Sequence, residues 1–165
     1  MNWDAIGAMG ELIGAAAVVV SLVYLAVQIR SQIAESRIAG MHAVSEGFRD
    51  AIGSLAENTS VARIWMKSHK DFKSLTHEEL VQMFGVAQRN FRVWEEAFGL
   101  YQTGRLDIDI FEGITKQYAA FLGHKGFRHV WEHRRDFYNQ AFREFVDSLP
   151  ASRYDIGING DDDDD

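Results

Sequence analysis

The sequence predicts an all-α protein with one N-terminal transmembrane helix followed by a cytosolic helical bundle. Residues 5–29 form a nearly continuous apolar run whose only charged side chain is Glu11. After residue 30 the chain becomes polar, apolar side chains recur at helical spacing, and the alternation typical of β-strands is nearly absent. These patterns divide the chain into a transmembrane helix with a short outer N-terminus (1–30), a cytosolic domain (31–150) and a disordered acidic tail (151–165).

The apolar run has the length of a membrane span. A helix that rises about 1.5 Å per residue covers about 33 Å over residues 6–27, and a bilayer core is about 30 Å thick. A cleavable signal peptide is less favoured, because the first ten residues contain Asp4 but no Lys or Arg. A buried soluble helix is also less favoured, because only about 120 residues remain to cover it.

The charges on either side of the run predict its orientation. The first 29 residues contain no Lys or Arg, whereas Arg30, Arg37 and Arg49 follow the span. Basic residues favour the cytoplasmic side, so we expect the N-terminus outside and the C-terminal domain in the cytoplasm. Trp3 and Tyr24 lie near the two ends of the run, and amphipathic rings prefer the membrane interface. We expect Arg30 to lie at the interface as well.

Small residues line one face of this helix at steps of three and four residues. The stripe consists of Gly7, Gly10, Gly14, Ala17 and Ser21. Small side chains let two membrane helices approach closely, and Gly10 and Gly14 form a GxxxG pair. We therefore expect self-association through the stripe. The alternative is that Gly and Ala are simply common in membrane helices.

Glu11 is the intramembrane polar residue of this segment. It lies beside Gly10 and borders the small-residue stripe, so its carboxylate needs a partner or access to water. Three interpretations remain open: the side chain extends to the outer headgroups, it hydrogen-bonds a neighbouring helix, or several copies form an ion or proton pathway.

A resemblance to a known group begins in this same segment. It covers NWDAIGAMGELIGAAAVVVSLVYLAVQIR (2–30), VARIW (61–65), FRVWEEAFGLYQTGRLD (91–107) and the spacing of Trp131, Arg135 and Tyr138. The chain resembles a widespread, uncharacterised group of small bacterial membrane proteins in which this segment precedes a helical domain. The resemblance implies that architecture and a bacterial inner-membrane location, and it assigns no catalytic residue.

Capping signals predict the helices of the cytosolic domain. The first helix continues past Arg30, with a bend near Gly40 or Gly47, and a new helix begins at Asn58, Thr59 and Ser60. Thr76 and Glu79 form a capping box that starts the central helix, which ends at Gly104. Three further helices are expected. One begins at Asp109 and ends at Gly123, a short one contains Trp131, and the last ends before Pro150.

One motif in this domain suggests metal chemistry. His129, Glu132 and His133 match H-x-x-E-H, which places two imidazoles one turn apart with a carboxylate beside them. The motif lies in a basic run that disfavours a divalent cation and consists of Lys125, Arg128, Arg134 and Arg135. We regard His129 and His133 as weak metal candidates and expect solvated side chains; contact with anionic lipid is an alternative for the basic run.

Composition excludes several other classes of function. The chain has no Cys, no P-loop, no G-x-S-x-G and no dinucleotide fingerprint after a strand. Of its net charge of −7, the tail carries −5, from Arg153 and six Asp that include the run 161–165. Nucleic acid is therefore not an expected partner. We also expect no cofactor and no catalytic residue.

These observations predict a structural, scaffold or accessory membrane module rather than an enzyme. Its expected partners are the lipid bilayer, further copies of the chain and an unidentified protein. An oligomer that conducts ions or protons near Glu11 is the alternative, and a metal-dependent hydrolase that uses His129, Glu132 and His133 is a less favoured one.

Overall fold

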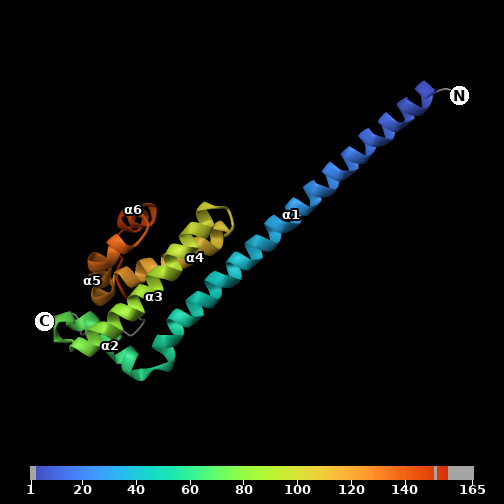
Figure 1. The fold of residues 1–165 in the computed structure, drawn as a ribbon. Helices are drawn as coiled ribbons and strands as arrows, with labels where there is room; N and C mark the ends of the chain where they lie inside the picture. The colour runs from blue at the N-terminus through green and yellow to red at the C-terminus, as the bar shows by residue number, and fades with distance from the viewer. Residues whose placement is uncertain (1–2, 151, 156–165) are drawn as a thin grey trace. The chain divides into compact units, whose positions relative to one another are not determined.

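The computed structural model describes residues 3–150 and 152–155, which form helices joined by short turns and loops, with no strand among them (Figure 1). The helices are α1 (Trp3–Glu57), α2 (Thr59–Lys70), α3 (His77–Gln102), α4 (Ile108–Leu122), α5 (Lys125–Arg134) and α6 (Gln140–Ser148). Two 3₁₀ turns, η1 (Phe72–Ser74) and η2 (Arg135–Phe137), connect some of them. The chain forms two compact units, Met1–Ala39 and Gly40–Asp165, which we call the N-terminal unit and the bundle.

The N-terminal unit consists of the first part of α1, and its apolar side chains are exposed on every side. Leu12 is 73% exposed and Val20 is 68% exposed. The most apolar 18-residue window has a mean hydropathy of 2.4, and none of it is buried. By length and composition, α1 is the one helix among the described residues that is able to cross a membrane.

The second part of α1 lies in the bundle. The helix continues past Arg30, as predicted, and is unbroken at Gly40 and Gly47, where the sequence suggested a bend. A Cβ at Gly40 would lie 3.0 Å from the carbonyl oxygen of Arg105, and one at Gly47 would lie 3.2 Å from Cγ2 of Val93. These glycines allow close packing of helices rather than a break in one helix.

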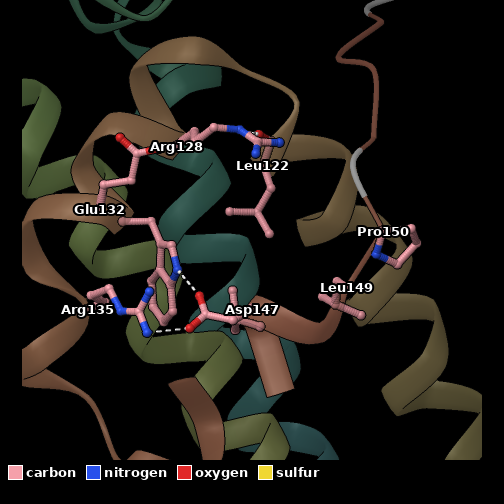
Figure 2. Close-up of a pocket in the computed structure, with 9 residues that line it drawn as sticks. Leu122, Arg128, Glu132, Arg135, Asp147, Leu149 and Pro150 are labelled. Atoms are coloured by element: carbon pink, nitrogen blue, oxygen red, sulfur yellow. Dashed lines mark hydrogen bonds and ion pairs between the residues drawn. The ribbon is translucent and has the colours of Figure 1, made fainter. Parts of the chain in front are cut away.

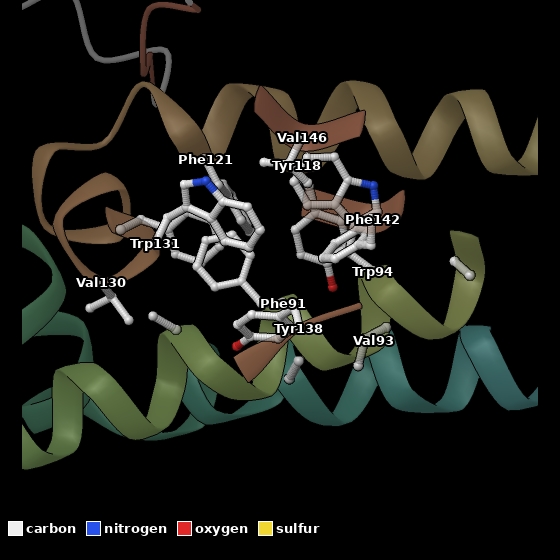
Figure 3. Close-up of a cluster of buried hydrophobic side chains, with 14 of the residues drawn as sticks. Phe91, Val93, Trp94, Tyr118, Phe121, Val130, Trp131, Tyr138, Phe142 and Val146 are labelled. Carbon is white, nitrogen blue, oxygen red and sulfur yellow. The ribbon is translucent and has the colours of Figure 1, made fainter. Parts of the chain in front are cut away.

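The core of the bundle is built mainly from aromatic rings around α3 (Figure 3). Trp94 of α3 stacks on Tyr118 of α4, with ring centroids 5.2 Å apart, and Phe91 stacks on Phe127 of α5 at 4.1 Å. Val44 of α1 is 1% exposed and completes the core from the other side of α3. Large buried rings contribute much apolar area per residue, which suits a bundle of this size.

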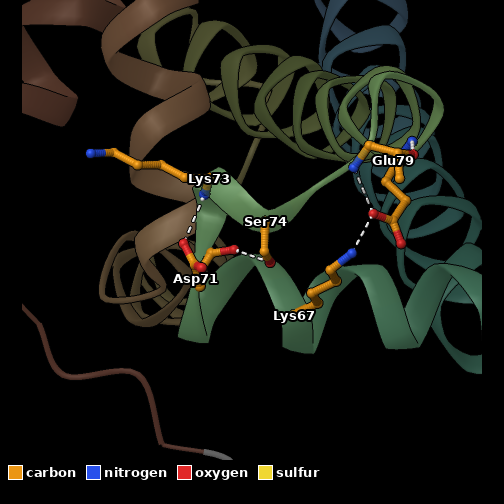
Figure 4. A network of polar contacts seen from close by, with 6 residues as sticks. Lys67, Asp71, Lys73, Ser74 and Glu79 are labelled. Atoms are coloured by element: carbon orange, nitrogen blue, oxygen red, sulfur yellow. Dashed lines mark hydrogen bonds and ion pairs between the residues drawn. The ribbon is translucent and has the colours of Figure 1, made fainter.

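The predicted start of the central helix is confirmed. The hydroxyl of Thr76 accepts the Glu79 N–H, and the Glu79 carboxylate accepts the Thr76 N–H at 2.8 Å, which completes a capping box. The same carboxylate accepts a 2.6 Å bond from Nζ of Lys67 on α2 (Figure 4). The hydrogen bond from Lys67 lowers the pKa of Glu79 most, and the hydrogen bond from the Thr76 N–H lowers it further. The cap thus also connects α2 to α3.

The other helix boundaries follow their local signals with one exception. Asn58 caps α2, as predicted, and α4 ends at Leu122, directly before Gly123. The predicted start of α4 at Asp109 is wrong. The side chain of Asp107 accepts the Asp109 N–H at 3.0 Å, so Asp107 is the cap and the helix begins at Ile108.

Part of the predicted tail packs against the bundle. Sequence analysis placed Tyr154 in the acidic tail, but Nε1 of Trp65 donates a 2.8 Å hydrogen bond to its hydroxyl, and the two rings lie 6.2 Å apart. Backbone atoms of Ser152 and Tyr154 also lie directly over Gly123, where a Cβ would come within 2.4 Å of them. The five-Asp run, 161–165, lies outside the described residues.

Candidate functional site

The small-residue stripe is an open surface in the N-terminal unit. A Cβ built at Gly7, Gly10 or Gly14 would meet nothing within 4 Å. Farther along the stripe, the hydroxyl of Ser21 donates to the Ala17 carbonyl at 2.9 Å, so it is satisfied within its own helix. The stripe is therefore an open, apolar face of the helix.

Glu11 and the predicted membrane-interface residues lie on the same exposed helix. Glu11 is exposed, and no ion pair involves it among the described residues. Trp3 is 69% exposed and Tyr24 is 64% exposed, and the Tyr24 hydroxyl accepts a 2.9 Å hydrogen bond from Nε2 of Gln28. Arg30 is exposed as well. None of these side chains packs into a core.

The bundle contains a cavity of about 300 Å³ that lies largely between α5 and α6 (Figure 2). We call it the α5–α6 pocket. It is lined by Leu122, Arg128, Trp131, Glu132, Arg135, Val146, Asp147, Leu149 and Pro150. Two guanidinium groups and two carboxylates give the lining a balanced charge, so it does not select a strongly charged ligand.

Most polar groups of this pocket are held by neighbouring protein groups. Asp147 accepts a 3.1 Å hydrogen bond from Nε1 of Trp131 and forms an ion pair with Arg135. Nε of Arg128 donates to the Leu122 carbonyl at 2.9 Å. The lining has no Ser, Thr, Lys or His, so it offers no hydroxyl or amine nucleophile beside a base. These contacts therefore hold α6 against α5, and α5 against the end of α4.

The structure brings the two histidines of the H-x-x-E-H motif together but adds no further metal ligand among the described residues. The His129 and His133 rings lie 4.1 Å apart, the His129 ring also packs on Phe72 at 4.0 Å, and Nδ1 of His133 donates to the His129 carbonyl at 2.8 Å. Burial, then the neighbouring His133, lowers the pKa of His129. Glu132 lines the α5–α6 pocket instead. The described residues contain no group of three or more His, Cys, Asp or Glu side chains placed to hold a metal ion.

Two further arginines of the basic run have intramolecular partners. The guanidinium of Arg134 lies 5.1 Å from the Phe84 ring and 5.4 Å from the Phe137 ring, and Arg135 is paired with Asp147. Such contacts hold the cations against the bundle rather than leave them available to anionic lipid. Lys125, Arg128 and His133 are exposed, as the sequence suggests, whereas Arg134 and Arg135 are partly buried.

Sequence reasoning missed a buried imidazole, His124, which is the N-cap of α5. Its Nδ1 accepts the Phe127 N–H at 3.1 Å, and its Nε2 donates to the Trp65 carbonyl at 2.9 Å. Burial, followed by the neighbouring His69, lowers its pKa to about 4. Only its position directly before the helix pattern signalled a cap, because Trp65 is 59 residues away.

Three features of the structure bear on function. The stripe is open, the α5–α6 pocket is internally bonded, and His124 is a buried neutral cap. No family model, curated protein or solved structure matches the chain.

Proposed function

We propose that the chain is a single-pass protein of the bacterial inner membrane that forms a homo-oligomeric structural, scaffold or accessory module through the small-residue stripe of α1. The observation that carries the proposal is the open space at Gly7, Gly10 and Gly14 on an exposed apolar helix. The N-terminus faces outward and the bundle faces the cytoplasm, where it is presented to a protein partner.

The bundle offers an internal precedent for the use of glycine in α1. At Gly40 and Gly47, the missing side chain admits atoms of Arg105 and Val93 at close range. At Gly7, Gly10 and Gly14, the same lack of a side chain admits nothing from the described chain. A second copy of α1 supplies the missing neighbour, because close backbone approach is the main source of attraction between helices in lipid.

The membrane location rests on the helix itself and on its flanks. Exposing this many apolar side chains to water is unfavourable at about 25 cal/mol for each Å² of apolar surface, whereas lipid accepts them. The absence of Lys and Arg before Arg30 favours the proposed orientation. The resemblance of residues 2–30 to the bacterial membrane group supports the inner membrane in particular.

The first test is the native mass of the full chain in lipid nanodiscs. Gly10→Leu and Gly14→Leu fill the stripe, and we expect each to reduce a defined oligomer to smaller species. Ala16→Leu is the matched control, because it adds the same bulk on another face of α1 and leaves the oligomer intact. A wild-type monomer, or equal disruption by the control, rules out the stripe as the interface.

A conducting oligomer is the second candidate function, favoured by the exposed Glu11 beside Gly10. In a ring of helices packed through the stripe, several such carboxylates approach one another near the axis and attract cations or share protons. Glu11→Gln tests this in a liposome flux assay. Loss of flux with an unchanged native mass supports conduction near Glu11, and unchanged flux rules out that hypothesis.

A further inference from the structure

Two imidazoles from different parts of the chain cap the start of α5. Nδ1 of His124 accepts the Phe127 N–H at 3.1 Å, and Nδ1 of His69, on α2, accepts the Lys125 N–H at 3.2 Å. The two rings lie 4.7 Å apart. Each hydrogen bond requires an Nδ1 without a proton, so this arrangement exists only while both imidazoles are neutral and carry their one proton on Nε2.

Tyr154 closes over the same two rings. Its ring lies 4.9 Å from that of His124 and 5.2 Å from that of His69, and its hydroxyl accepts the hydrogen bond from Nε1 of Trp65. Residues 152–155, which we call the strap, pass over Gly123 so closely that a Cβ there would overlap their backbone. The strap thus joins the end of the described chain to α2 and to the start of α5.

The strap also forms one wall of an apolar cavity of about 460 Å³ in the bundle. The cavity is lined by Phe48, Ile52, Leu55, Ala62, Trp65, Met66, Gln117, Phe121 and Tyr154. Removing Tyr154 from this wall widens the cavity and uncovers the indole of Trp65. Tyr154 therefore covers part of this apolar surface.

We propose that the strap is an acid-sensitive latch: protonation of His69 and His124 releases Tyr154 and opens the apolar cavity beside it. A proton on Nδ1 replaces an acceptor with a donor that faces a backbone N–H. It also places positive charge at a helix N-terminus, where the helix dipole is already positive. Both effects disturb the positions of the two imidazole rings against which the Tyr154 ring packs.

The charged groups near the latch set the direction of the effect. Lys125 begins α5, Lys70 follows His69, and Arg128 lies one turn farther along α5, so new positive charge on the imidazoles meets further cations. In the strap, Arg153 and Asp155 flank Tyr154, and Asp155 is the carboxylate able to offset that charge. Burial keeps the pKa of His124 near 4, so release belongs to acidic conditions.

The chain has no cysteine, so a single spin label reports on the strap without background. We suggest labelling Asp155→Cys in the full-length protein in nanodiscs, which also removes the competing carboxylate. As the pH is lowered from about 7 to about 3.5, through the pKa of His124, we expect the label to shift from an immobile to a mobile component, reversibly and with constant far-UV circular dichroism. Tyr154→Ala provides the released reference at all pH values.

The decisive comparison removes the titrating groups but keeps their acceptors. His124→Asn retains a good cap, and His69→Gln retains a side-chain acceptor. In the double variant we expect the label to stay immobile across the whole pH range; if this variant is mobile at pH 7, His124→Asn alone is compared instead. The proposal is overturned if the wild-type label never becomes mobile, if the variants respond like wild type, or if mobility appears only with loss of helix.

Discussion

An added methyl group would meet different surroundings at different glycines of this bundle. Gly126 in α5 faces Ser68 of α2: an added Cβ would lie 2.4 Å from the Ser68 hydroxyl and 2.7 Å from its Cβ. Rotation of the hydroxyl does not relieve this overlap, because the Ser68 Cβ is fixed by the backbone and its Oγ already donates to the Trp65 carbonyl at 2.7 Å. Gly113 in α4 faces open space.

We therefore expect Gly126→Ala and Gly113→Ala to change stability in opposite directions. The first forces α2 and α5 apart and lowers the free energy of unfolding by about 1–3 kcal/mol. The second raises it by about 0.5–1 kcal/mol, because Ala loses less backbone freedom in a helix than Gly. Urea unfolding in detergent, followed by near-UV circular dichroism of the buried aromatics, measures both. Equal effects of the two substitutions contradict the packing argument.

At the scale of an element, α3 depends on the first turn that Thr76 caps. Thr76→Ala removes the hydroxyl that accepts the Glu79 N–H, which leaves one donor of the first turn without its partner. We expect a loss of about 1 kcal/mol in the free energy of unfolding. Thr76→Ser is the matched control because it keeps an acceptor at the same position. If Ser and Ala variants unfold alike, the hydroxyl has no capping role.

The helices also show which elements are predictable from sequence. Thr76, Asn58, Gly123 and Pro150 act through neighbours only a few residues away, and the boundaries that they predict are confirmed. Gly40 was ambiguous because a glycine that permits a bend and one that permits close packing look alike in sequence. Its close neighbour is the carbonyl oxygen of Arg105, which lies in the loop between α3 and α4, far along the chain.

At the scale of the whole molecule, the buried His124 makes stability depend on pH. Its folded pKa, about 4, lies below its ordinary value of 6.5, so the folded state disfavours the proton. The contribution is fully present above pH 6.5 and is lost as the pH falls through 4, and the complete loss amounts to about 3 kcal/mol.

We expect urea unfolding to reveal this pH dependence directly. Between about pH 7 and about pH 4.5, the wild-type protein should lose more unfolding free energy than His124→Asn, which caps α5 but does not titrate in that range. The carboxylates are common to both proteins, so their effect cancels in the difference. Parallel loss in the two proteins shows that His124 does not carry the pH dependence.

The candidate sites were less predictable than the fold. His124 meets Trp65 across 59 residues, and Tyr154 meets the same indole across 89, so neither contact leaves a local pattern in the sequence. The motif around His129 is a local pattern, and it does bring the His129 and His133 rings within 4.1 Å of each other, but Glu132 lines the α5–α6 pocket instead. The stripe from Gly7 to Ser21 and the role of Glu11 remain predictions, since their partner is another molecule.

The continuity of α1 determines how the protein is divided for expression. No loop separates the exposed apolar residues from Val44 and Ala51, which are buried in the bundle core. A soluble fragment that begins at the first loop, near Asn58, discards those core side chains and uncovers Val93. A fragment that begins within the helix, between Arg30 and Gly40, keeps them. The useful cleavage point is therefore in the middle of a helix.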